Sequence, residues 1–337
     1  MMQSRTGDAL DAMRRRICPS LAVGLLLAAA AAAQPVTSGA SMPSGKLWHH
    51  DKNLVSREGS AISDIGTGAY RALGAHRFPV PTRDGSRYLE ERYDASEDTT
   101  EIWIRRSSDG GVMDRFVVDG AITDVEFSPV NANLIRMNWG ENALSYSTYA
   151  VYDLAARRVI WADDDRSRTQ YTAWLPDGRL LGLSSGGLLT AITTTGTRQT
   201  TVLGNLPLRP NQRPLDLVVS PRGQPLLVDI ADVDDQGRVL RHDYWLSSLD
   251  GRDPQQITAA DGRASHPIFS PDGQFIAFRI GYGTSDLVSA CELRYVPISA
   301  RNVSRTSRAA REFRGLKDAA GKVYPHGLGC ELLAWLP

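Results

Sequence analysis

A serine pattern used by hydrolases occurs at Gly182-Leu-Ser-Ser-Gly186. In such enzymes the serine of Gly-x-Ser-x-Gly is a nucleophile that lies on a strained turn between a strand and a helix. Here an apolar stretch precedes the pattern and another, Leu188 to Thr193, follows it. We therefore expect a β-hairpin turn of small residues, and no nucleophile at Ser184.

An acidic stretch offers oxygen ligands at the spacing of a calcium loop. Side-chain oxygens stand at positions 1, 3, 5 and 12, and Gly237 allows the bend. The residues are Asp232, Asp234, Gln236 and Asp243. An aspartate replaces the long bidentate glutamate, and no helix is expected on either side, so a solvated hairpin is the favoured interpretation and Ca²⁺ the alternative. No other cofactor is expected.

Histidines could bind a transition metal if several converged with carboxylates. Six are scattered along the chain, namely His49, His50, His76, His242, His266 and His326. Their convergence depends on the fold, so the elements that carry them must be considered first.

The stretch His266 to Ile280, HPIFSPDGQFIAFRI, predicts a β-hairpin. Pro271 fixes φ in the turn, and Gly273 accepts a positive φ. Weaker copies recur along the chain, and their aligned turn positions are Arg83, Pro129, Pro176, Pro221, Pro271 and Pro337. The steps are 46, 47, 45, 50 and 66 residues, and five of the six copies carry a large apolar residue two positions earlier. A repeat of this length holds four short strands and must stack on its neighbours around a ring.

We therefore predict an all-β fold: a six-bladed β-propeller of four-stranded antiparallel blades. The third strand of five blades is visible as a β-branched or aromatic run, at 101–106, 149–154, 188–193, 243–251 and 292–298. The chain ends on CELLAWLP, which supplies only the innermost strand of the sixth blade. Its outer strands must come from residues 46–73, so pairing of the N- and C-terminal strands closes the ring.

The copies PIFSPDGQFIAF, YTAWLPDGRLLGL and VVSPRGQPLLV resemble the Pro-Asp-Gly repeats of the TolB-like β-propeller family over about residues 78–337. This resemblance implies a six-bladed propeller in the bacterial periplasm. It concerns the repeats and not TolB itself, whose α/β domain before the propeller has no counterpart ahead of the first repeat. Because the family occurs in many contexts, the fold alone does not predict a function.

In a propeller, the residues five or six positions before the aligned proline begin each innermost strand. They should surround one mouth of the central channel, where acidic, basic, amide and aromatic groups could bind a ligand. These residues are Arg77, Asp124, Gln170, Tyr171, Asp216, His266 and Glu331. The alternative is a solvated polar rim that only satisfies the strand ends.

The N-terminus has the pattern of a secretory signal peptide. Basic residues at 14–16 precede an apolar run, Leu21 to Ala33, which ends in three alanines. We expect a signal peptide at 1–33, a flexible linker at 34–45 and one propeller domain at 46–337, with an insertion at about 300–325. The segment Ser304 to Lys317 within that insertion is either a helix or a loop. The mature protein is expected to be periplasmic or secreted, without membrane insertion.

The whole chain has 38 basic and 38 acidic residues, so no excess of positive charge favours nucleic acid. Cys291 and Cys330 remain after removal of the leader. In an oxidising compartment we expect them to form a disulfide, and two buried thiols are the alternative.

These features favour a non-enzymatic, monomeric module that binds a protein or peptide partner of the cell envelope, or another ligand, through one face or the channel mouth. The alternative is a propeller enzyme, of the lyase or lactone hydrolase type, with a divalent metal at that mouth.

Overall fold

The computed structural model describes residues 43–51, 59–74, 79–140, 146–163, 169–259, 264–282, 290–304, 306–313, 316, 321 and 331–337. All described residues belong to one compact unit, Met42–Pro337. Within these ranges all regular elements are β-strands. No helix in the described ranges has the length and apolar character needed to cross a membrane.

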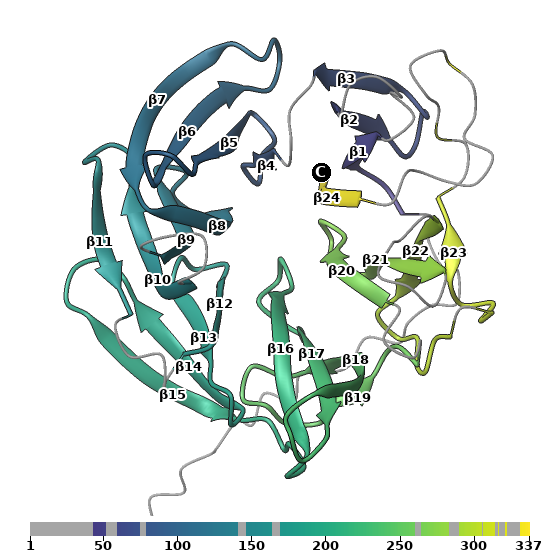
Figure 1. Ribbon diagram of the computed structural model, residues 1–337. Coiled ribbons are helices and arrows are strands. Elements are labelled where there is room, and N and C mark those ends of the chain that lie inside the picture. The colour runs from purple at the N-terminus through teal and green to yellow at the C-terminus, as the bar shows by residue number, and fades with distance from the viewer. Residues whose placement is uncertain are drawn as a thin grey trace, which may run out of the picture. The chain divides into compact units, whose positions relative to one another are not determined.

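Six four-stranded antiparallel sheets surround a central opening, which confirms the predicted six-bladed β-propeller (Figure 1). Blade 1 consists of β4 (Val80–Pro81), β5 (Arg87–Asp94), β6 (Thr99–Arg106) and β7 (Val112–Asp119). Blade 2 consists of β8 (Ala121–Phe127), β9 (Leu134–Gly140), β10 (Tyr146–Asp153) and β11 (Arg158–Ala162). Blade 3 consists of β12 (Tyr171–Trp174), β13 (Leu180–Leu183), β14 (Leu188–Thr193) and β15 (Gln199–Asn205).

The remaining blades follow the same order from the channel outward. Blade 4 consists of β16 (Gln212–Val219), β17 (Leu226–Val233), β18 (Val239–Ser247) and β19 (Gln255–Gln256). Blade 5 consists of β20 (Ala264–Phe269), β21 (Phe275–Tyr282), β22 (Ala290–Pro297) and β23 (Arg311–Glu312). Blade 6 combines the C-terminal strand β24 (Glu331–Leu336) with β1 (Lys46–Asp51), β2 (Gly59–Asp64) and β3 (Tyr70–Gly74).

The Pro-Asp-Gly turns join the first and second strands of the blades, as predicted. In blade 5 the N–H of Gly273 donates to the carbonyl of Ser270 at 2.8 Å, and Gly273 has a φ of +64°. Ser270 Oγ also accepts from the N–H of Phe275 at 2.9 Å. A Cβ at Gly273 would lie 2.9 Å from Ser220 Oγ in the corresponding turn of blade 4. The glycine therefore permits both the turn and the close packing of neighbouring blades.

Strand β24 closes the ring by antiparallel pairing with β1, from Lys46 opposite Leu336 to His50 opposite Glu331. The predicted closure by the two ends of the propeller is thus confirmed. Trp335 packs with blade 5, and its Nε1 donates to the carbonyl of Ser44 at 2.9 Å.

The core lies between adjacent blades. Blades 1 and 2 share one apolar cluster that includes Leu89, Ile102 and Ile135, and blades 4 and 5 share another that includes Leu246 and Phe278. The apolar residues two positions before each aligned turn position all lie in innermost strands, and the five predicted third strands correspond to β6, β10, β14, β18 and β22.

Two sequence-based expectations concern segments outside the core. In the segment Ser304 to Lys317, the described residues form turns and β23, which pairs with β22. The predicted signal peptide and all but the last three linker residues lie outside the described residues.

Candidate functional site

The innermost strands are irregular where they line the channel. The pairing register shifts between Thr123 and Glu126 in blade 2, between Pro214 and Asp216 in blade 4, and between Ser265 and Ile268 in blade 5. Such shifts mark β-bulges, which change the direction of the side chains around them. Asp124 and His266 both have a φ of +52°, an uncommon conformation for residues other than glycine. Asp124, Asp216 and His266, each five positions before the aligned turn position, therefore lie where the regular strand pairing is interrupted at one end of the channel.

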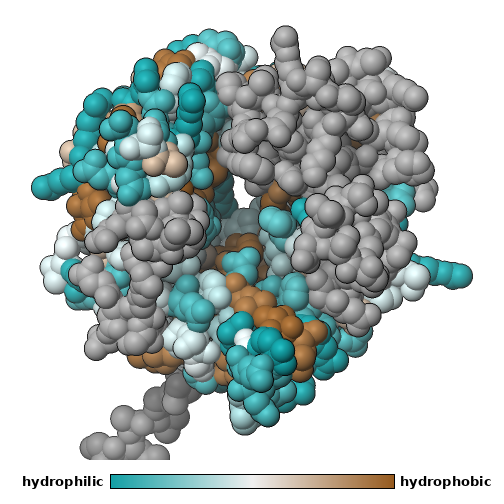
Figure 2. Space-filling model, in the orientation of Figure 1, coloured by the Kyte–Doolittle hydropathy of each residue, from teal (hydrophilic) through white to brown (hydrophobic). Residues whose placement is uncertain are grey.

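The structure places most of the predicted mouth residues on innermost strands. Asp124 is in β8, Tyr171 in β12, Asp216 in β16 and His266 in β20, while Gln170 directly precedes β12. Tyr171 is half-buried, and the other four are exposed. Arg77 lies outside the described residues, and Glu331 is described only as part of the backbone of β24. Figure 2 shows the open channel with hydrophilic and hydrophobic groups mixed around its lower rim.

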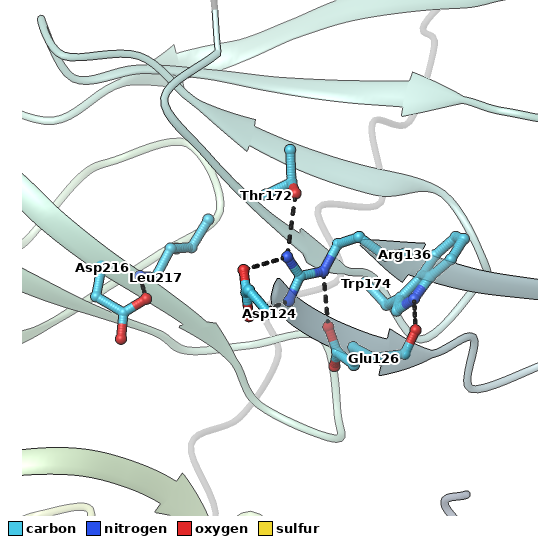
Figure 3. A network of polar contacts seen from close by, with 7 residues as sticks. All are labelled: Asp124, Glu126, Arg136, Thr172, Trp174, Asp216 and Leu217. Carbon is cyan, nitrogen blue, oxygen red and sulfur yellow. Dashed lines mark hydrogen bonds and ion pairs between the residues drawn. The ribbon is translucent and has the colours of Figure 1, made fainter. Parts of the chain in front are cut away.

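A buried arginine organises the blade 2 side of this mouth (Figure 3). Arg136, in β9, binds both carboxylate oxygens of Asp124, at 2.6 and 3.0 Å, and its Nε donates to Glu126 at 3.1 Å. The Arg136 side chain is only 6% exposed, whereas those of Asp124 and Glu126 are 54% and 44% exposed. The two carboxylates therefore form the channel surface, and the arginine holds them from behind.

The same arginine connects blade 2 to blade 3. Arg136 also donates to Thr172 Oγ1 at 3.4 Å, and Trp174 Nε1 donates to the backbone carbonyl of Glu126 at 3.1 Å. Burial alone would lower the pKa of Arg136, but Asp124 and Glu126 raise it well above its ordinary value. Arg136 is thus a permanent cation whose charge is already matched by two carboxylates.

The next two blades around the ring, blades 3 and 4, contribute a tyrosine and an aspartate to the mouth. The carboxylate of Asp216 accepts a hydrogen bond from the N–H of Leu217 at 2.7 Å. Although part of the Asp216 side chain is exposed, desolvation within the channel raises its pKa. The Leu217 N–H opposes this effect, and the charges of Asp124 and Asp229 add to it. Burial and the charge of Asp216 raise the pKa of Tyr171. These groups interact electrostatically across the channel, as expected for side chains that face one space.

Behind Asp216, a partly exposed histidine forms a pair with a buried aspartate. His242 Nδ1, in β18, lies 3.0 and 2.9 Å from the two carboxylate oxygens of Asp229 in β17. Burial raises the pKa of Asp229, and the hydrogen bond to His242 opposes this rise. Asp229 is directly opposite Asp216 in the sheet, so the pair adjoins the channel lining.

A further carboxyl group near the mouth has no counter-ion in the part of the chain that the structure describes. Glu91, in β5, has a buried Oε2 without a hydrogen-bond partner among the described residues. Burial, and then the charge of Asp124, raises the pKa of Glu91 to about 7. Among the described residues, the lining therefore combines five carboxyl groups with two histidines, His242 and His266, and two arginines, of which Arg136 is already paired with two of the carboxylates and Arg213 acts on Tyr171. Its excess of negative charge suits a cationic ligand.

Sequence reasoning identified the residues on the innermost strands and missed those on the second and third strands. Arg136, Glu91, Asp229 and His242 were not among the predicted site residues. Arg136 and Asp229 carry a sequence signal, because each is a charged residue in a largely apolar strand, as in LLVDIADV for Asp229. Glu91 and His242 lie in strands with several charged residues and carry no such signal. A charge at such a position requires a partner or the channel.

The predicted calcium residues have protein partners. Asp232 accepts from Gln212 and Arg241, Asp234 accepts from Arg238, and Asp243 accepts from Thr258 and Gln256. Asp234, Gln236 and Gly237 form the turn between β17 and β18. In the described ranges no group of three or more His, Cys, Asp or Glu residues could hold a metal ion. Calcium binding stays a prediction without support from these contacts.

Two other predictions concern cysteine and serine chemistry. Cys291 is in β22, but Cys330 lies outside the described residues, so the disulfide stays a prediction. Ser184 is in the turn between β13 and β14, where the N–H of Gly187 donates to its carbonyl at 3.0 Å. This is the predicted hairpin turn.

A cavity of about 390 Å³ lies between blades 6 and 1, away from the channel mouth. Its acidic residues are occupied within turns, since Asp64 accepts from Thr67 and Asp84 accepts from Thr82 and Ser86. We therefore consider these carboxylates structural.

Comparison with known proteins supports the fold. No protein-family model and no curated protein matches the chain. Among solved structures, TolB from Acinetobacter baumannii is similar, with a TM-score of 0.53 and 16% identity over 75% of this chain. The match spans 61% of that TolB chain. This likeness confirms the TolB-like propeller fold expected from the repeats.

Two other solved structures show weaker likeness. A prolyl endopeptidase gives a TM-score of 0.49 and 11% identity, over 77% of this chain and 47% of that one. Oligogalacturonate lyase from Vibrio parahaemolyticus gives a TM-score of 0.48 and 13% identity, over 72% of this chain and 73% of that one. Neither likeness bears on function.

Proposed function

We propose that this protein is an exported, non-enzymatic binding module of the cell envelope, which binds a cationic segment of a protein or peptide through the channel mouth. The observation that carries the proposal is the ring of polar side chains at one register. Asp124, Tyr171, Asp216 and His266 come from the innermost strands of four successive blades, each five positions before the aligned turn position.

The chemistry of the mouth supports a cationic ligand. Asp124 and Glu126 together carry more charge than Arg136, so the three side chains leave a net negative charge beside Asp216 and Glu91. Lysine and arginine side chains can pair with carboxylates and stack on aromatic rings, and Tyr171 stands beside Asp216 in the ring. Export to the periplasm rests on the signal peptide predicted at 1–33 and on the resemblance of the repeats to the TolB-like family. A ring closed by β24 needs no second subunit to cover its ends, which favours a monomer.

Calorimetric binding of a tetralysine peptide tests this proposal. We expect binding that weakens with salt, no binding of tetraglutamate, and about five- to tenfold weaker affinity for Asp216→Asn. Asp235→Asn removes the same charge from an exposed turn and serves as the control. The proposal is wrong if tetralysine fails to bind, or if both variants bind it as the wild type does.

The alternative function, a propeller enzyme, draws support from the Asp229–His242 pair. A histidine oriented by a carboxylate is a common general base. If the protein acts through a divalent metal, the purified protein should contain it stoichiometrically, and a chelator should lower the melting temperature. Turnover of a small substrate that is lost in His242→Gln would favour the enzyme over the binding module.

A further inference from the structure

Glu91 lies on the face of blade 1 that packs against blade 2. Its Cα partner in β6 is Ile102, and both Ile102 and Leu89, two residues before Glu91, belong to the apolar cluster shared with blade 2. Side chains two apart in a strand point to the same face. The Glu91 carboxyl is therefore at the channel end of an apolar contact between two blades.

The charged surroundings of Glu91 are all negative among the described residues. On β6 the residues of the same face are Thr100, Ile102 and Ile104, and β4 contributes only Val80 and Pro81. Blade 2 presents Asp124 to Glu91. The nearest described cation behind Asp124 is Arg136, which already binds Asp124 and Glu126.

A carboxyl group in this position favours its neutral form. Its Oε2 is buried without a partner among the described residues, so ionisation places a poorly solvated charge beside a second carboxylate. The direction of the pKa shift, upward to about 7 through burial and then Asp124, agrees with this geometry. The charge of the channel mouth thus changes within the neutral range.

We propose that Glu91 is the proton-binding residue of the channel mouth and that a cationic ligand binds there in exchange for its proton. This inference rests on the proposed function, since it concerns the same mouth and the same class of ligand. A cation near the ionised Glu91 supplies the counter-ion that the described residues do not provide, whereas protonated Glu91 offers it no charge. Ligand affinity therefore increases as the pH rises through neutrality, and the ligand is released on acidification.

The coupling between proton binding and ligand binding determines how strongly the ligand affinity depends on pH. If the cation binds only the ionised form, the apparent dissociation constant at about pH 6 is roughly tenfold higher than at about pH 8. Binding near neutral pH should also release protons, which calorimetry detects as a dependence on the ionisation enthalpy of the buffer.

Two measurements on the full chain test the inference. The first follows the carboxyl titration of ¹³C-labelled glutamate by NMR without ligand. We expect one resonance with a pKa near 7 that is absent in Glu91→Gln and present in Glu97→Gln, a control at an exposed turn position. The second compares tetralysine affinity at about pH 6 and pH 8. We expect the pH dependence in the wild type and in Glu97→Gln, and none in Glu91→Gln.

The outcomes separate this inference from the proposed function. A Glu91 resonance that titrates below about pH 5 would overturn the inference and leave cation binding intact. A titration near 7 without tetralysine binding at any pH would overturn the proposed function and the exchange together. Binding with an unchanged pH dependence in Glu91→Gln would overturn the exchange alone. At pH 5, where Glu91 is protonated, unfolding of Glu91→Gln should match the wild type and so confirm that the variant folds.

Discussion

At the scale of single residues, the channel mouth depends on a buried cation that a ligand does not need to touch. Arg136 holds Asp124 with two hydrogen bonds and Glu126 with one, while its own side chain is almost fully buried. A buried ion pair of this kind adds little net stability to the fold. Removal of the arginine is nevertheless costly, because it leaves the carboxylates without a counter-ion. Arg136 also fixes the positions of two channel carboxylates, because Asp124 sits in a bulge with a positive φ that alone would be unfavourable.

We predict that Arg136→Met lowers the free energy of unfolding by about 3 kcal/mol at neutral pH, because Asp124 and Glu126 lose their counter-ion. The loss should shrink on acidification, because burial raises the pKa of Glu126 and protonation removes its need for a counter-ion. Arg106→Met is the matched control. Its ion pair with Asp109 is about half exposed on both sides, so its loss should cost about 1 kcal/mol or less. Chemical denaturation at about pH 7 and pH 4 measures both; equal effects of the two variants would contradict the role given to Arg136.

At the scale of elements, the connections between blades determine where the inner strands begin. Between β7 and β8, the N–H of Gly120 donates to the carbonyl of Asp98 at 2.7 Å, and Thr100 Oγ1 donates to the carbonyl of Gly120 at 2.8 Å. Thr100 Oγ1 also accepts from the N–H of Ile122 at 3.1 Å. These bonds tie the start of blade 2 to the middle of blade 1 and so set the position of Asp124.

Gly120→Ala should therefore be strongly destabilising. Gly120 has a φ of +85°, and a Cβ there would lie 2.3 Å from the backbone oxygen of Gly140, which cannot move as a side chain would. We expect a loss of about 2 kcal/mol or more, from conformational strain together with the clash. Gly237→Ala, at a φ of +76° with open space around it, isolates the conformational part and should cost about 1 kcal/mol. If both substitutions give the same melting temperature, the close contact with Gly140 does not matter.

These connections also explain which features the sequence could reveal. The turn at Pro271 to Gly273 depends on local conformational preferences, so its repetition predicted the inner strands, the blade number and the ring closure. The position of Asp124 in the channel followed from the same repeat. Arg136 and Glu91 could not be placed in this way, because their partners lie on other strands or blades. A bulge between Thr123 and Glu126 changes the alternation on which such an assignment would depend.

At the scale of the whole molecule, β24 connects the two ends of the propeller and also two blade interfaces. Trp335 packs in the cluster shared with blade 5, and Leu336 packs with Tyr88 of blade 1. Gly85 in the first turn of blade 1 lies so close to Leu336 that a Cβ would contact it at 2.9 Å. Without β24, β1 would present an open edge to the channel, and blades 5 and 1 would each lose part of their packing.

Deletion of residues 330–337 should consequently unfold the ring rather than shorten it. Burial of Leu332, Trp335 and Leu336 contributes about 2 to 3 kcal/mol for each side chain, and the strand pairing with β1 is lost as well. This total is comparable to the stability of a typical domain, about 5 to 15 kcal/mol. Removal of the exposed Pro337 alone should leave the melting temperature unchanged. Circular dichroism of the two truncated chains distinguishes the cases, and a cooperative, native-like transition after the longer deletion would show that blade 6 closes the ring without its innermost strand.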